Sequence, residues 1–405
     1  MNTNQTPNTV SPRRRTRIAL AAGGAALLVA GAVTFGISAR GDADADADAA
    51  YRDVLESRMQ ELVTAGYPGV LASVTAPDGT RTDVAVGEGE LGSGTAPPTD
   101  GEVRVGSNTK MAVATIVLQL VQEGAIALDE PVDTYLPGLV AGDGIDGTTI
   151  TVRDLLQHTS GLPETADQVA ADAFGAQERY ISPRDLLDLA LTMPADFAPG
   201  ERWAYSNTNY HVLGLVIEQV TQRALADQID QRIAEPLGLE HTYLPTPGER
   251  QLRGEHPEGY HADVPGELRE ITDMDPSFGW AAGSLVSTPS ELNTFMQALF
   301  GGELIDDESL ALLQSTVPAP DPFHADTAYG LGVQSYELDC GGLAWGHGGD
   351  IPGTQTRNAV ASDGTAVTIA VTALPWALVD QADEETLLQQ YQVVIDALDE
   401  TLCDD

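Results

Sequence analysis

The sequence contains almost no lysine, few cysteines and little positive charge. Its 405 residues include 20 lysines plus arginines against 61 aspartates plus glutamates, which gives a formal net charge of −41. Such a surface repels nucleic acids and anionic lipids, so a nucleic-acid-binding protein is not expected. It suits a domain in salty water, where counter-ions screen the self-repulsion. With 42% hydrophobic and 20% charged residues, the composition is globular rather than disordered.

The few positive charges are concentrated at the N-terminus, which indicates export. Residues 1–40 hold five arginines and no acidic residue, and an apolar run follows the arginine cluster at residues 18–39. The run is 22 residues long, enough to cross a bilayer. We expect residues 1–40 to be a signal peptide or signal anchor. The remainder would be extracytoplasmic, either secreted or tethered to the membrane through residues 18–39. The alternating Asp-Ala residues 41–50 are expected to form an acidic linker.

Only two cysteines occur, Cys340 and Cys403. An even number of cysteines in an exported chain makes a disulfide the expected state. It would tie the C-terminal tail to the segment before residue 347, and two free buried thiols are the alternative. The seven histidines contain no pair with the spacing of a zinc-peptidase helix, so we expect no metal and no other cofactor.

The single lysine, Lys110, stands three residues after Ser107 at the start of an apolar run. Residues 104–124 have helical periodicity, with Gly124 placed to end the helix. A spacing of three puts the serine hydroxyl and the lysine amine on one side of the first turn. A buried lysine can act as a base, whereas arginine cannot be deprotonated. The pair is therefore a candidate nucleophile and base; a capping serine followed by an exposed lysine is the alternative.

The hydrophobic pattern predicts an α/β fold of the α+β kind, in which both chain ends build an antiparallel sheet flanked by helices. The sheet lobe would comprise about residues 51–106 and 275–405, and an inserted, mainly helical lobe about residues 107–274. Together they would form one domain, residues 51–405. Expected strands are residues 70–76, 82–86, 280–286, 330–336, 343–347, 356–361 and 365–372; expected helices are residues 51–66, 153–158, 183–191, 210–233, 290–300 and 384–398.

Three short motifs follow one another along the chain. They are Ser107-Asn108-Thr109-Lys110, Tyr205-Ser206-Asn207 and His347-Gly348-Gly349. In this order they make the chain resemble the serine β-lactamase-like superfamily, on the branch of class C β-lactamases, secreted D-alanyl-D-alanine carboxypeptidases and family VIII esterases. The resemblance implies a β-lactamase/transpeptidase-like fold and a serine hydrolase domain. It covers about residues 51–400, with further matches at residues 155–163, 199–201, 236–239 and 282–288.

The first two motifs are expected to perform acyl transfer. Ser107 would attack a carbonyl carbon and become acylated, with Lys110 as its base. Tyr205 would carry a proton to the leaving amine, and its phenol is expected to be more acidic beside a lysine cation. Asn207 offers its amide to the lysine or to the substrate. A packed aromatic and a turn amide are the structural alternatives for the last two residues.

The third motif is expected to bind the substrate. His347 would lie on an edge strand facing the serine, where the resemblance implies an electrostatic and orienting role; a buried structural histidine is the alternative. Gly348 and Gly349 suit a strand that a ligand approaches closely. By analogy, the oxyanion hole would combine the backbone N–H groups of Ser107 and Asp350.

The leading hypothesis for function is a D-alanyl-D-alanine carboxypeptidase, a monomer that cleaves the peptide stem of peptidoglycan through an acyl-enzyme. The alternatives are a β-lactamase or esterase acting on small molecules, and a non-catalytic penicillin-recognising receptor. Gly348 lacks the hydroxyl that carboxypeptidases often use to bind a terminal carboxylate, Arg357 is the nearest cation, and Asp350 adds negative charge. These departures favour an esterase or amidase, whereas Cys340 and the Tyr-Ser-Asn-Thr-Asn sequence favour the carboxypeptidase branch.

Overall fold

The protein is described here by a computed structural model. Its contacts divide the chain into two compact units, Met1–Ala49 and Ala50–Asp405. The described parts of the chain are residues 34–166, 172–324 and 326–404.

The first helix, α1 (Thr34–Thr64), begins in the first unit and continues into the second. Most of the expected signal segment, residues 1–33, lies outside the described residues. Residues 41–50, expected to be a linker, belong to α1. No helix within residues 34–166, 172–324 and 326–404 is long and apolar enough to span a membrane.

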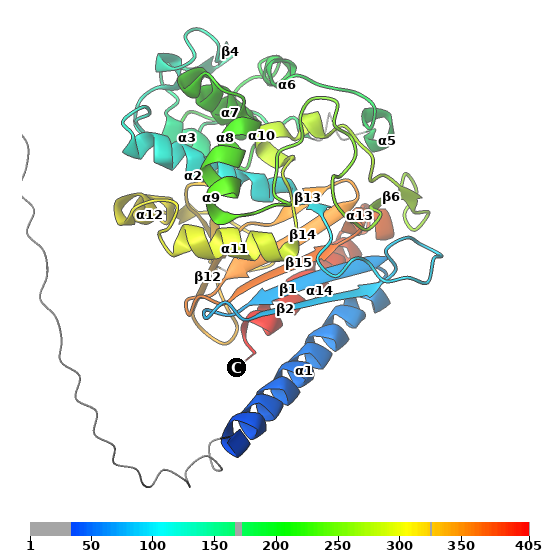
Figure 1. The fold of residues 1–405 in the computed structure, drawn as a ribbon. Helices are drawn as coiled ribbons and strands as arrows, with labels where there is room; N and C mark the ends of the chain where they lie inside the picture. Colours follow the sequence, from blue (N-terminus) through cyan, green and yellow to red (C-terminus); the bar gives the residue numbers. More distant parts are fainter. Residues whose placement is uncertain (1–33, 167–171, 325, 405) are drawn as a thin grey trace, which may run out of the picture. The chain divides into compact units, whose positions relative to one another are not determined.

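An antiparallel sheet of nine strands forms the centre of the second unit (Figure 1). The hairpin of β1 and β2 pairs with β15 from the other end of the chain, as the sequence predicts. The strand order is β2-β1-β15-β14-β12-β11-β10-β9, and β13 pairs separately with β14. The bounds are β1 (Gly69–Thr75), β2 (Arg81–Gly87), β9 (Val317–Pro318), β10 (Ala328–Tyr329), β11 (Gln334–Glu337), β12 (Leu343–Gly346), β13 (Gly349–Ile351), β14 (Thr354–Val360) and β15 (Ala366–Val371).

Both faces of this sheet are covered, and the neighbouring strands β1 and β15 are buried along their whole length and mostly apolar. Helix α14 (Glu384–Leu402) and the second half of α1 pack on one face. Helix α11 (Pro289–Phe300) covers the other face and joins it to the helical lobe. Successive side chains of a strand point to opposite faces, so β15 contributes to both cores: Val367, Ile369 and Val371 to the first, Ala366 and Ala370 to the second.

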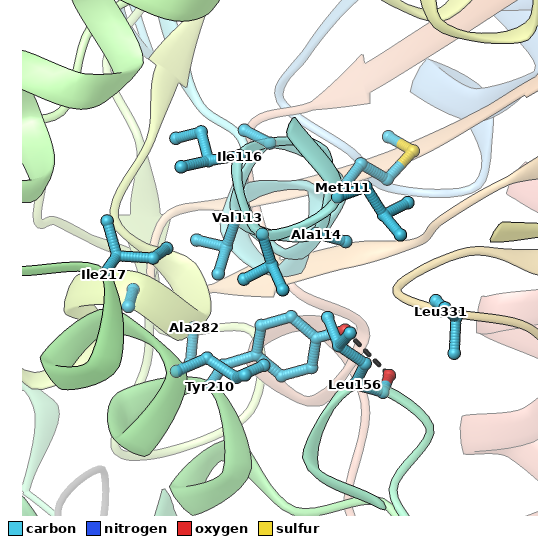
Figure 2. Packing of buried hydrophobic residues seen from close by; sticks show 14 of the residues in the cluster. Met111, Val113, Ala114, Ile116, Leu156, Tyr210, Ile217, Ala282 and Leu331 are labelled. Atoms are coloured by element: carbon cyan, nitrogen blue, oxygen red, sulfur yellow. Dashed lines mark hydrogen bonds between the residues drawn. The ribbon is translucent and has the colours of Figure 1, made fainter. Parts of the chain in front are cut away.

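The helical lobe is built around α2 (Thr109–Gln122), with α7 (Asn207–Thr221) and α10 (Trp280–Gly283) against it and α3 (Val152–Leu156) packed on α7. Figure 2 shows Val113 of α2 next to the ring of Tyr210 of α7, with Met111 and Ile116 on the other side of the helix. Eleven of the 14 residues of α2 are buried. A helix enclosed on nearly all sides gives the side chains at its N-terminus a rigid support.

Shorter elements complete the fold. These are η1 (Gly106–Asn108), η2 (Val132–Thr134), α5 (Ala173–Ala176), α6 (Pro183–Ala190), α8 (Leu225–Ile229), the π-helical η3 (Asp230–Ala234), α9 (Glu235–Leu237), η4 (Pro276–Phe278), α12 (Asp307–Leu313), α13 (Pro375–Leu378) and the two-residue strands β3 (Val103–Arg104), β4 (Ala141–Gly142), β5 (Ile145–Asp146), β6 (Tyr260–His261), β7 (Arg269–Glu270) and β8 (Val286–Ser287).

Besides the linker, two sequence predictions about secondary structure are wrong, and the strand expected at residues 330–336 begins only at Gln334. The strand expected at residues 280–286 is the helix α10, followed only later by β8. A short apolar run fits a buried helix as well as a strand, so its pattern could not decide. The helix expected at residues 210–233 begins at Asn207 and breaks at Gln222, which has a φ of 54°. An αL residue at this position ends a helix in the usual way.

The expected disulfide is present and joins Cys340 to Cys403. Its Cα atoms lie 5.7 Å apart, within the range that an S–S bond spans. Cys403 follows α14 directly, so the bond attaches the end of that helix to the loop between β11 and β12.

Replacing Cys340 by serine is expected to lower the free energy of unfolding by about 2–5 kcal/mol, because the unfolded chain loses a cross-link across 63 residues. Thermal melting under oxidising conditions measures the change. Cys403→Ser should give the same loss, and reductant should bring the wild type to the level of both variants. A variant that melts like the oxidised wild type would contradict the expectation.

Candidate active site

The fold brings the three sequence motifs to one place. Ser107 lies in η1, directly before α2, which carries Lys110. Tyr205 lies just before α7, whose first residue is Asn207. His347 lies between β12 and β13. The site is thus assembled where the helical lobe meets the sheet.

Ser107 has the two partners that the sequence predicts for a nucleophile. Lys110 Nζ lies 3.0 Å from Ser107 Oγ, and the Tyr205 hydroxyl lies 2.8 Å from the same oxygen. Lys110 is fully buried, so the alternative of an exposed lysine is excluded. Ser107 lines both cavities described below, so a substrate carbonyl bound there can be attacked by its hydroxyl.

Burial controls the protonation of Lys110. It lowers the pKa of the amine from 10.5 to about 7, and the Glu164 carboxylate opposes this shift. Besides the serine, Nζ contacts two groups that can only accept, Asn207 Oδ1 and the Ala282 carbonyl, each at 2.7 Å. A neutral amine has two N–H bonds for these acceptors. Its lone pair is then directed at the Ser107 hydroxyl, which is the arrangement of a base.

Glu164 is a site residue that the sequence analysis missed. Its Oε2 accepts hydrogen bonds from the Asn207 backbone N at 2.7 Å and from Asn207 Nδ2 at 3.0 Å. Because Asn207 Nδ2 is held by the Glu164 carboxylate, the other end of the amide, Asn207 Oδ1, faces Lys110. Glu164 therefore positions the amide that orients the lysine, and the turn interpretation of Asn207 does not apply. The only signal in the sequence was its place directly after residues 155–163.

The expected acidity of Tyr205 is wrong. Burial raises the pKa of its phenol well above 10, more than the hydrogen bond to Ser107 lowers it. The Tyr205 ring lies 4.4 Å from the buried ring of His158, which contributes to this apolar setting. Tyr205 keeps its proton at neutral pH and can donate it to a leaving group, but it cannot remove one from the serine.

His347 differs in part from its expected role. It precedes the short strand β13 rather than lying on it, and it is 4% exposed. Burial and the nearby Lys110 lower the pKa of the imidazole to about 3, so at neutral pH the ring carries no charge. Its Nδ1 lies 2.6 Å from the Gly348 carbonyl, and its Nε2 lies 3.0 Å from the Tyr329 hydroxyl. An orienting role fits these contacts, whereas a cationic role does not.

The two glycines of the third motif have different reasons to be glycine. A Cβ on Gly349 would lie 2.0 Å from the Val105 carbonyl and 2.6 Å from Asn108 Nδ2, so the close neighbour is the chain itself rather than a ligand. For a Cβ on Gly348 the nearest atoms belong to the flexible Arg357 side chain, the first of them at 3.1 Å. Gly348 lines a cavity with Ser107, as expected of a residue that a ligand approaches.

The backbone around Asp350 lies against the serine loop. A Cβ on Gly106 would be 2.7 Å from the Asp350 nitrogen, and the φ of Gly106 is +53°, so only glycine fits. Ser107 and Asp350 line the same cavities, which is compatible with the proposed oxyanion hole. The Asp350 carboxylate is turned to Arg357, with an N–O distance of 3.0 Å.

Two cavities meet at Ser107, Asn207 and Asp350. The first has a volume of about 680 Å³, and its walls include Phe278 and Trp376. The second, of about 430 Å³, is lined by other groups: Tyr205, Asp321, Phe323, His324, Tyr336, His347, Gly348, Arg357, Tyr391 and Leu398 among them. Within the described ranges, no three His, Cys, Asp or Glu side chains are arranged to hold a metal.

The chain is similar to several known proteins. The crystal structure of a D-stereospecific amidohydrolase from Streptomyces sp. is 34% identical with a TM-score of 0.72, over 84% of this chain and 97% of that one. Penicillin-binding protein 4 of Amycolatopsis lactamdurans is 28% identical over 307 residues, 73% of this chain and 78% of the relative. A putative D-alanyl-D-alanine carboxypeptidase of Escherichia coli K12 is 27% identical over 287 residues, 64% of this chain and 62% of that relative's length.

A family model described as Beta-lactamase matches residues 52–392, which include all three motifs and nearly the whole second unit. This match, together with the contacts of Ser107 with the buried Lys110 and with Tyr205, shows that the chain belongs to the beta-lactamase family and is a serine hydrolase of that family.

Proposed function

We propose that the protein hydrolyses amide bonds in which the acyl group is a D-amino acid residue, through an acyl-enzyme on Ser107. The observation that supports acyl transfer is the set of three contacts of Lys110 Nζ: when Asn207 Oδ1 and the Ala282 carbonyl accept its two N–H bonds, the lone pair of the neutral amine is left for the Ser107 hydroxyl. The D-aminoacyl specificity is supported by the 34% identical D-stereospecific amidohydrolase, of which 97% is matched.

The residues divide the reaction between them. Lys110 accepts the Ser107 proton while Oγ attacks the carbonyl carbon, and the N–H groups of Ser107 and Asp350 stabilise the negative oxygen. When the C–N bond breaks, the Tyr205 hydroxyl protonates the leaving nitrogen. Lys110, whose Nζ lies 4.8 Å from the centre of the Tyr205 ring, returns the proton to the phenol. A water molecule then releases the acid by the same steps in reverse.

The position of Tyr205 indicates which cavity binds the leaving group and which binds the acyl group of the substrate. The proton donor to the leaving group lines only the second cavity, so that cavity takes the leaving group and the first takes the acyl group. In the described residues, Arg357 is the one lysine or arginine lining either cavity, and Asp350 already pairs with it. A leaving group without a free carboxylate, such as a simple amide, therefore fits better than a terminal D-alanine.

A D-alanyl-D-alanine carboxypeptidase acting on peptidoglycan stem peptides is the second candidate. It is favoured by Arg357, which lies at the wall of the leaving-group cavity and could bind a carboxylate if Asp350 released it. The names of the curated relatives from Escherichia coli and Amycolatopsis lactamdurans agree with it. In both cases we propose an extracytoplasmic location, supported by the basic and apolar N-terminus and by the disulfide.

The substrates can be separated with one purified protein. Release of product is measured from D- and L-phenylalanine amide, from an Nα-acyl D-Ala-D-Ala peptide and from benzylpenicillin, with Ser107→Ala as the blank. We expect the D-amide to be cleaved far faster than the L-amide and faster than the peptide. Faster cleavage of the peptide would favour the carboxypeptidase, turnover of penicillin a β-lactamase, and equal rates for both enantiomers would contradict D-specificity.

A further inference from the structure

Tyr329 is a buried residue outside the three motifs that contacts two histidines of the site region. It belongs to β10 and is 0% exposed. Its hydroxyl lies 3.2 Å from His158 Nε2 and 3.0 Å from His347 Nε2. A hydroxyl has only one proton to donate, so the direction of each of these hydrogen bonds decides the tautomer of His347.

The first end of the chain of hydrogen bonds is fixed at His158. Its Nδ1 lies 3.2 Å from the backbone nitrogen of Ser206, and a backbone N–H can only donate. Nδ1 therefore has no proton. Complete burial lowers the pKa of His158 well below 6.5, so the ring is neutral and its proton is on Nε2. Nε2–H donates to Tyr329, which leaves the phenolic proton for His347.

The second end is fixed independently at His347. Its Nδ1 lies 2.6 Å from the Gly348 carbonyl, which can only accept, so the proton of the neutral ring is on Nδ1. Nε2 must then accept from the Tyr329 hydroxyl. The deductions from the two ends agree: the donors run from His158 through Tyr329 to His347 and on to Gly348.

The end of this chain lies next to the proposed oxyanion hole. Gly348 O is separated from the Asp350 N–H by one residue, Gly349. The backbone N of His347 is held as well, since it donates to Asn358 Oδ1 at 3.3 Å. Asn358 Nδ2 in turn donates to Asn108 Oδ1 at 2.5 Å, beside the nucleophile. Ring and backbone of His347 are thus both anchored, the ring through Tyr329.

We propose that Tyr329 is a positioning residue: its hydroxyl holds His347 in the Nδ1–H tautomer and thereby sets the Gly348 peptide and the Asp350 N–H for the oxyanion. The effect on rate rests on the acyl-transfer function proposed above. It does not rest on D-specificity, and the tautomer itself depends on neither. Because an oxyanion exists only in the transition state, loss of the positioning should lower kcat more than it raises KM.

The first test uses nitrogen NMR of the whole protein labelled with ¹⁵N-histidine, with the His347 signals identified by their absence in His347→Asn. In the wild type, we expect His347 to carry its proton on Nδ1 and to accept a hydrogen bond at Nε2. In Tyr329→Phe, the chemical shift of His347 Nε2 should move to the value of a nitrogen that accepts no hydrogen bond. The population of the Nε2–H tautomer should also increase. A wild-type His347 protonated on Nε2 would overturn the proposal even if the variant failed to fold.

The second test measures the acylation burst with p-nitrophenyl acetate, an ester whose acyl group is not a D-residue. Tyr329→Phe is expected to lower the rate constant of acylation, which is kcat for this step, by up to about tenfold, with little change in KM. Tenfold corresponds to the free energy of about one hydrogen bond. The control is Tyr243→Phe, which removes another buried hydroxyl. That hydroxyl donates a hydrogen bond to Glu102 and accepts one from the backbone N–H of Arg253. The control variant should leave the His347 signals and the burst unchanged.

The combined results decide the role of Tyr329. A changed Nε2 signal together with a lower kcat supports positioning. A lower kcat with unchanged His347 signals would show that the hydroxyl acts in another way, and a changed signal with normal kcat would show that the tautomer does not matter for acylation. Each of the last two results overturns the proposal. Failure of D-specificity appears instead in the comparison of amide enantiomers and affects neither readout.

Discussion

Replacing Lys110 by arginine is expected to lower the rate of Ser107 acylation by about 10²–10⁴-fold, although the positive charge is kept. A guanidinium cannot lose its proton in the working range of pH, so it cannot accept the one from the serine. The measurement is the rate of adduct formation with a slow acylating substrate, followed by mass spectrometry. An arginine variant that acylates at the wild-type rate would exclude Lys110 as the base.

The pH dependence of the wild type supplies the matching control. Burial lowers the pKa of Lys110 to about 7, so the fraction of neutral amine rises about tenfold per pH unit below 7 and levels off above it. The acylation rate should follow this curve, rising with pH and not falling. Lys110→Met, which is uncharged and of similar length, should be slow and flat with pH. Its melting temperature shows whether the fold tolerates the loss of the amine.

Gly349→Ala is expected to destabilise the protein by about 3 kcal/mol or more and to disrupt the site. Its new Cβ would lie 2.0 Å from the Val105 carbonyl, a backbone atom at the start of the serine loop that cannot rotate away. The clash separates β13 from η1, and with them the two N–H groups proposed for the oxyanion. Denaturant unfolding measures the loss of stability.

Gly348→Ala is the matched control for this substitution. Neither glycine has a positive φ, so alanine is not strained by the backbone at either position. At Gly348 the Cβ would meet the end of the flexible Arg357 side chain at 3.1 Å. We expect a loss below about 1 kcal/mol there. Equal losses of stability in the two variants would contradict the assignment of Gly349 to packing against the serine loop.

The sequence predicted the parts of the site that follow from short-range spacing and from motif order. Ser107 and Lys110 are three residues apart on one helical turn, so their contact needed no tertiary information. The antiparallel sheet made from both chain ends also followed from alternating runs near the two termini.

What could not be predicted depends on burial and on contacts between remote segments. The Ala282 carbonyl accepts a hydrogen bond from Lys110 because residues 280–283 form a helix. The sequence could not show this, since an apolar run of that length fits a helix and a strand equally well. The phenol of Tyr205 was expected to be more acidic, because the motifs indicated a cation nearby but not the burial that raises the pKa of the phenol. Glu164 and Tyr329 carry no motif, and only the folded chain places them at the site.

The pairing of Val70 with Val371 has a consequence for biosynthesis. The first hairpin leaves the ribosome long before β15 is translated, and a sheet edge without its neighbour has no stable packing. The nascent polypeptide should therefore remain loose until translation is nearly complete. Such a delay is what the proposed export would require, because a translocation channel admits only an unfolded chain. A protease should digest ribosome-bound chains that stop before β14 while sparing the finished protein.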